Sequence, residues 1–175
     1  MLKRSATGKA VPGQAAQRLL QSAVAAARAP SLYAVMGAPD TIEGRFELLT
    51  LHTILLIERL RTEGDATEGL RQALFDAFIG HLDGAMREMG VGDLAMGKRM
   101  RKLGEAFYGR AASFRSALAA LPDDELLQSV ISRTVLEGAA ASPAPLADYV
   151  ARSHAALGQG SLGEMVAGAP NWATA

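Results

Sequence analysis

The segment LAMGKRMRKLGEAFYGRAASFRSALAAL, Leu94 to Leu121, decides the fold class of this chain. With the ideal α-helical step of about 100° per residue, its large apolar side chains fall on one narrow stripe. The stripe consists of Met96, Met100, Leu103, Phe107, Phe114, Leu118 and Leu121. We therefore interpret the segment as one long helix whose stripe, including Met96 and Met100, packs in the protein core.

Apolar residues recur at helical spacing along almost all of the other segments, and no long run alternates with the period of a strand. The most apolar run, LLTLHTILLI (Leu48 to Ile57), is too short to span a bilayer, which needs roughly 20 residues, and we interpret it as a buried helix. The sequence predicts an all-α, single-domain helical bundle of about six helices. The expected helices are 14–28, 41–61, 67–88, 92–120, 123–138 and 144–157, with a short turn near 161–167.

The ends of the chain differ in composition from its middle. The first 39 residues contain five basic residues and no acidic ones, which superficially resembles an organellar transit peptide, but we expect a retained N-terminal segment. We divide the chain into a variable segment with the first helix (1–26), a helical domain (27–157) and a Gly- and Ala-rich tail (158–175).

Seven large apolar residues are predicted to form one core because each lies on the apolar side of its helix. They are Phe46, Leu49, Ile54, Phe75, Phe78, Phe107 and Phe114.

Two other faces of the segment 94–121 have a distinct character. Lys98, Arg101 and Lys102 lie roughly opposite the apolar stripe, so this basic face is expected to meet solvent or a partner. A third strip contains Gly97 and Gly104, seven residues apart, with Ala111 following. Such small residues favour close approach of a second helix, which would belong either to the same domain or to a partner.

The residues that usually carry out catalysis or bind metals are sparse. The chain has no Cys, and His52, His81 and His154 are far apart in sequence with no metal-binding spacing. We interpret His52 as a core or interface histidine, with haem ligation by His52 or His81 as the alternative. We expect no enzymatic activity, no cofactor and no metal. Because the net charge is zero, we also expect no nucleic-acid binding.

Two stretches resemble the ubiquinol-cytochrome c chaperone family, which assembles the respiratory reductase that contains cytochrome b. They are ARAPSLYAVMGAPDTIEGRFELLTLH (Ala27 to His52) and LFDAFIGHLDGAMREMGVGDLAMGKRMRKLGEAFYGRAASF (Leu74 to Phe114). The resemblance implies an all-helical, non-enzymatic chaperone that binds newly made cytochrome b or a related membrane subunit. It also implies a small partner subunit and peripheral contact with a membrane.

We expect a bacterial-type member of this family, without the long N-terminal extension of the mitochondrial members. We expect it in the cytoplasm, peripherally at the inner face of the membrane, or in the mitochondrial matrix or at the inner membrane if the source is eukaryotic.

The part of the chain that carries most of the resemblance also supplies the expected partner-binding surface. Its residues are Arg87, Glu88, Asp93, Lys98, Arg101, Lys102, Tyr108 and Arg110. Arg87, Glu88 and Asp93 have an alternative role, in which they brace the turn at 90–93 through caps and ion pairs. Met86, Met89, Met96 and Met100 offer one adjacent apolar surface, since Met side chains adapt to varied partners. The alternative is that all four lie in the core, which we favour for Met96 and Met100.

Two other functions remain open at this stage. One is a helical module that binds haem or another small apolar ligand in an internal pocket. The other is a peripheral membrane adaptor without a specific client, held by its basic residues at anionic lipid.

Overall fold

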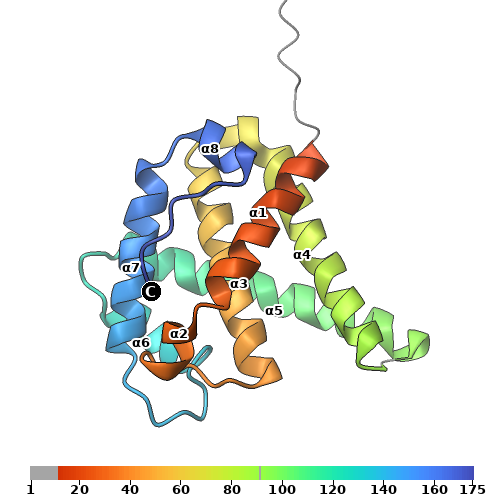
Figure 1. The fold of residues 1–175 in the computed structure, drawn as a ribbon, viewed down its shortest axis with the longest axis horizontal. Coiled ribbons are helices and arrows are strands. Elements are labelled where there is room, and N and C mark those ends of the chain that lie inside the picture. The colour runs from red at the N-terminus through yellow and green to blue at the C-terminus, as the bar shows by residue number, and fades with distance from the viewer. Residues whose placement is uncertain (1–11, 91) are drawn as a thin grey trace, which may run out of the picture.

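The computed structural model describes residues 12–90 and 92–175, and within these residues the chain is all-α, without strands (Figure 1). The start of the predicted N-terminal segment, residues 1–11, lies outside the described part. The helices are α1 (Pro12–Ala27), α2 (Pro30–Ala34), α3 (Ile42–Arg61), the 3-10 helix η1 (Gly64–Thr67), α4 (Glu68–Glu88), α5 (Asp93–Ala119), α6 (Glu125–Ser132), α7 (Ala144–Gln159) and α8 (Leu162–Ala167).

The six expected helices correspond to α1, α3, α4, α5, α6 and α7, and the expected turn near 161–167 is the short helix α8. Two differences stand out. The five-residue helix α2 was not predicted. In addition, α6 ends at Ser132 rather than at 138, because the chain then closes a turn in which the Leu136 N–H donates to the Ile131 carbonyl at 3.0 Å.

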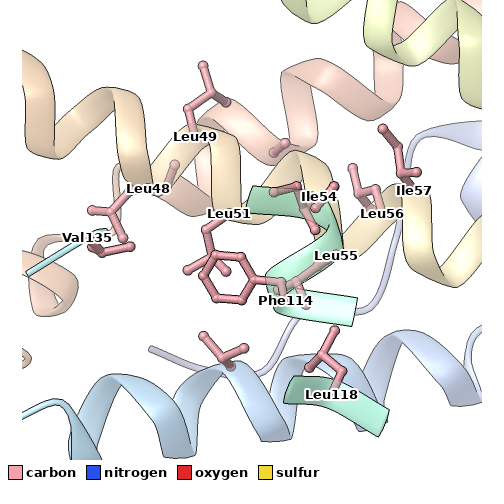
Figure 2. Close-up of a cluster of buried hydrophobic side chains, with 14 of the residues drawn as sticks. Leu48, Leu49, Leu51, Ile54, Leu55, Leu56, Ile57, Phe114, Leu118 and Val135 are labelled. Carbon is pink, nitrogen blue, oxygen red and sulfur yellow. The ribbon is translucent and has the colours of Figure 1, made fainter. Parts of the chain in front are cut away.

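Helix α3 forms the centre of the domain. Its first turn is capped by Thr41, whose hydroxyl accepts from the Gly44 N–H at 3.1 Å. Every residue from 48 to 60 is buried, so the prediction of a buried helix at Leu48–Ile57 is confirmed. The helix contacts α1, α4, α5 and α7, and Figure 2 shows its leucines and isoleucines with Phe114 of α5.

The predicted core is largely confirmed. Leu49, Ile54, Phe78, Phe107 and Phe114 are buried. The other two predicted members, Phe46 and Phe75, are half-buried and pack against the core.

The predicted stripe of α5 also faces inward. Met96, Phe107, Phe114 and Leu118 are buried, while Met100, Leu103 and Leu121 are half-buried against the core.

The small-residue strip of α5 does not form a close helix contact along its length. A Cβ atom at Gly97 would have nothing within 4 Å, and one at Gly104 would meet only the Phe75 ring, at an ordinary 3.8 Å. Only Ala111 is buried. The expectation of close backbone approach along this strip is therefore wrong, because the neighbour at Gly104 is an aromatic side chain of α4.

The C-terminal segment packs back onto the domain. Helix α8 begins with a capping box formed by Ser161 and Glu164. The Arg18 side chain donates to the Val166 carbonyl at 3.0 Å, and the Trp172 indole N–H donates to the Ser22 hydroxyl at 3.0 Å. These contacts join the end of the chain to α1. None of the helices in the described residues is both long enough and apolar enough to cross a membrane.

Candidate functional site

A mainly apolar groove of about 370 Å³ opens between the end of α1, α2, the start of α3, the second half of α4 and α5. Its walls come from five helices that are separated in sequence by up to about 80 residues. The lining residues are Val24, Ala27, Arg28, Tyr33, Ile42, Glu43, Arg45, Phe46, Leu49, His81, Leu82, Ala85, Met86, Met89 and Leu103.

The rim of this groove exposes large apolar side chains to solvent. Ile42, the first residue of α3, is 63% exposed, and Met89, next to the end of α4, is 54% exposed. Exposed apolar surface beside a concave apolar wall is typical of an interaction site. Met86 and Met89, which the sequence indicated as an adaptable apolar surface, both belong to the groove.

A few polar side chains lie at one side of the groove. Arg45 donates to Asp40 at 2.6 Å, and this hydrogen bond holds the pKa of the Asp40 carboxyl below its usual value. The Tyr33 hydroxyl donates to the Ala27 carbonyl at 2.8 Å, and burial raises the pKa of that phenol. Arg45 and Tyr33 are thus held in place, whereas the carboxylate of Glu43 is exposed beside them.

The three predicted bases of α5 lie outside the groove. Lys98, Arg101 and Lys102 are all exposed, and none of them lines the groove, although Leu103 of the same helix does. Figure 1 places the end of α4 and the start of α5 at one end of the long axis of the molecule. The basic face therefore starts near this end of the molecule and continues along α5.

Arg110 has partners within the domain. Its guanidinium binds both carboxylate oxygens of Glu47 on α3, with Nε donating to Oε2 at 2.7 Å, and lies 5.9 Å from the centre of the Phe46 ring. This bidentate pair is mostly shielded from water, so it joins α5 to α3 next to the groove.

The other predicted site residues spread over two regions. Arg87 pairs with Asp83 at 2.8 Å on the surface of α4, and Glu88 is exposed at the end of that helix. Asp93 is the first residue of α5, but its side chain lies outside the described residues. Tyr108 is 59% exposed and stacks near Phe75, away from the apolar groove. The structure therefore does not gather the eight residues into one site.

The histidines do not form a metal site. His52 is fully buried; its Nδ1 lies 2.7 Å from the Leu48 carbonyl and its Nε2 lies 2.8 Å from the Tyr149 hydroxyl. Both ring nitrogens are thus engaged by protein groups, which confirms His52 as a core histidine. His81 lines the apolar groove. Across residues 12–90 and 92–175, no three His, Asp or Glu side chains are grouped to hold a metal.

Comparisons with known proteins agree with this architecture. A family model described as Ubiquinol-cytochrome C chaperone matches residues 34–172, so the match extends past the stretches that carried the sequence resemblance and includes α6, α7 and α8. The crystal structure of the Cbp3 homolog from Brucella abortus superimposes with a TM-score of 0.81 and is 32% identical in sequence; the match covers 93% of this chain and 91% of that chain. No curated protein sequence matches the chain.

Proposed function

The chain belongs to the ubiquinol-cytochrome C chaperone family, and from this membership we propose that it is a non-enzymatic assembly chaperone for ubiquinol-cytochrome c reductase. Its client is a newly made membrane subunit of that enzyme, and cytochrome b is the client that we favour. The observation that carries the proposal is the apolar groove, whose rim leaves Ile42 and Met89 in water.

An unassembled membrane subunit exposes apolar helices that would otherwise aggregate in water. A groove of about 370 Å³ is large enough for a few side chains of such a segment, so an amphipathic or apolar helix would bind through anchors one turn apart. Met86 and Met89 suit this role, because unbranched thioether side chains repack against different anchors. Binding of this kind is reversible and needs no reaction, as a chaperone requires.

The basic face of α5 would contribute a second, electrostatic contact. Lys98, Arg101 and Lys102 are exposed on the same helix that supplies Leu103 to the groove. They would meet acidic loops of the client, a small partner subunit or anionic lipid headgroups at the membrane surface, where each base contributes about 1 kcal/mol. This arrangement supports peripheral membrane contact during client transfer.

The groove is tested by placing charge on its apolar rim. The double variant Ile42→Glu with Met89→Glu should lower recovery of cytochrome b with the tagged full-length protein about tenfold, since each carboxylate would be desolvated by a bound apolar segment. Both positions are exposed, so the melting temperature should hardly change. The measurement is quantitative mass spectrometry of reductase subunits that co-purify from solubilised membranes.

A matched control is available in the same chain. Val35 is 74% exposed and Leu126 is 40% exposed, and neither lines the groove. The double variant Val35→Glu with Leu126→Glu adds the same charge and should leave recovery unchanged. Equal recovery with both double variants would contradict the groove as the client site. A Soret band that forms with haem and disappears in His81→Gln would favour the small-ligand alternative.

The basic face is tested separately by charge reversal. Changing Lys98, Arg101 and Lys102 together to Glu should preserve the fold, because surface substitutions usually cost within about 0.5 kcal/mol each. Assembly of the reductase in cells should fall several-fold, with the protein present at wild-type level. Normal assembly in such cells would remove this face from the mechanism and leave the apolar groove as the contact.

A further inference from the structure

A second groove, of about 270 Å³, lies between the last turns of α3, the first half of α4 and the second half of α5. Its lining residues are Ile57, Arg61, Glu68, Arg71, Gln72, Phe75, Phe107, Tyr108, Ala111 and Arg115. It shares no residue with the apolar groove described above. Three arginines and three aromatic rings line this groove, so its ligand should differ from the apolar segment proposed for the first groove.

Two of the arginines share one carboxylate. Arg115 binds Glu58 in a bidentate manner, with Nε to Oε2 at 3.0 Å and Nη2 to Oε1 at 2.9 Å. Arg61 Nε lies 3.4 Å from the same Oε2. Glu58 is only 7% exposed, so it is committed to this pair and has little capacity for a further cation.

Arg71 is the third arginine that lines the groove. Its Nε is buried and has no hydrogen-bond acceptor among the described residues, and it makes no ion pair there. Gln72, beside it on α4, donates its amide to Asp76 at 2.9 Å. A guanidinium N–H can only donate, and a buried donor without an acceptor is unfavourable. The groove therefore lacks an acceptor that a ligand would supply.

The charge of the groove also indicates that a ligand would supply a negatively charged acceptor. Three arginines and one carboxylate, Glu68, line the groove, and Glu58 pairs with Arg61 and Arg115, so among the described residues three positive charges meet two negative ones. A guanidinium presents paired donors that match the two oxygens of a carboxylate.

Aromatic rings form the wall beside these arginines. Phe75 lies 5.1 Å from Phe107 and 5.0 Å from Tyr108, measured between ring centres. Tyr108 is 59% exposed, so one face of this aromatic cluster is open to water. Such a surface accommodates a flat or branched apolar side chain, which a bare inorganic anion does not offer.

We propose that this groove binds a short acidic segment of a protein partner. A carboxylate of the segment pairs with Arg71, and an adjacent aromatic or aliphatic side chain packs on Tyr108 and Phe75. The site is separate from the apolar groove, so the chaperone can hold an apolar client and an acidic partner at the same time. This two-site arrangement does not depend on the identity of the client.

The test uses the 15N-labelled full-length protein and records the Nε–Hε resonance of Arg71, which reports directly on the buried donor. The ligand is the capped peptide acetyl-Gly-Phe-Asp-Gly-amide, compared with its Asn analogue, with inorganic phosphate and with phosphatidylcholine–phosphatidylglycerol vesicles. The acidic peptide should shift the resonance in a saturable way, and the Asn analogue should bind about tenfold more weakly.

Variants distinguish a specific site from general attraction of an acidic peptide to surface arginines. Arg71→Met and Tyr108→Ala should each weaken binding of the acidic peptide about tenfold or more, since a paired Arg or an aromatic anchor contributes this much at interfaces. Because Arg71→Met lacks the Arg71 resonance, the affinities of all variants are compared through the backbone amide resonances of the groove. Arg133→Met removes an equal charge at an exposed position outside the groove and should leave affinity unchanged.

Three results would overturn the proposal. The first is no shift of the Arg71 resonance by the acidic peptide. The second is an equal shift by phosphate at the same concentration, which would indicate an anion site only. The third is binding of anionic vesicles that requires Arg71, which would indicate a lipid site.

Discussion

Replacing Phe107 with alanine is expected to lower the free energy of unfolding by about 3 to 5 kcal/mol. The Phe107 side chain is 2% exposed, and its ring centre lies 5.1 Å from those of both Phe75 and Phe78. Removing the ring takes apolar area out of the core, leaves a cavity between α4 and α5, and ends the aromatic contacts with Phe75, Phe78 and Tyr108. A loss of this size is a large part of the stability of an ordinary domain.

Urea unfolding followed by circular dichroism measures this loss. The adjacent residue Tyr108 provides the control, because Tyr108→Ala deletes an aromatic ring from the same helix at a position that is 59% exposed. The control should cost about 1 kcal/mol or less. If both variants unfold at the same urea concentration, Phe107 does not occupy the central place that the packing assigns to it.

The contrast between these neighbours also shows why the fold was predictable from the sequence. A helix that packs against others on one side must repeat its apolar residues with the helical period, and the stripe through Met96, Phe107 and Phe114 does so over most of α5. The run Leu48–Ile57 is apolar on all sides, which is the expected pattern for a helix surrounded by others. Long periodic segments therefore fixed the all-α class and the central position of α3.

Short elements and contacts between helices were harder to predict from the sequence. Helix α2 has only five residues, too few for a periodic pattern, and it starts at Pro30 with one buried leucine, Leu32. The strip of small residues in α5 suggested close backbone approach, but the space at Gly104 is taken by Phe75, whose position depends on the placement of α4. Sequence spacing within one helix does not determine which side chain of another helix will fill a gap.

The candidate site could be predicted only in part for the same reason. Met86 and Met89 were identified because they lie in the segment with the strongest family resemblance. Val24, Ile42 and Leu49 were not, because they come from other helices and meet the two methionines only after folding. The apolar residue Ile42 directly after the capping Thr41 was a weak sign, since the first residue of a helix is usually exposed.

Acid should destabilise the protein through His52, by about 3 kcal/mol between pH 6.5 and pH 4. Burial lowers the pKa of this imidazole from 6.5 to about 4, because the fully enclosed ring cannot be hydrated when charged. In the neutral ring, Nδ1–H donates to the Leu48 carbonyl and Nε2 accepts from the Tyr149 hydroxyl. Protonation of Nε2 would require the Tyr149 hydroxyl to turn and accept, and would place a positive charge in the core between α3 and α7.

The direction of this change in stability follows from proton uptake by the unfolded chain. Below pH 6.5 the unfolded chain binds a proton at His52 that the folded protein does not bind until about pH 4. The stability contributed by the neutral ring is therefore fully present above pH 6.5, declines as the pH falls through this window, and falls no further once the folded state is also protonated. Exposed carboxylates with lowered pKa, such as Asp40 and Glu164, add losses mainly near and below the lower end of the window.

The measurement is the free energy of unfolding in urea at several pH values, compared with the variant His52→Gln. Glutamine can still hydrogen bond to Tyr149 but does not titrate, so the variant should be less stable at neutral pH and its stability should depend much less on pH down to about 4. His154→Gln is the control, because burial lowers the pKa of that half-buried imidazole as well, and it should keep most of the wild-type pH dependence. Parallel pH profiles for the wild type and His52→Gln would show that the core does not hold the ring neutral. A profile that is flattened only in His52→Gln would assign the acid sensitivity to the contact of His52 on α3 with Tyr149 on α7.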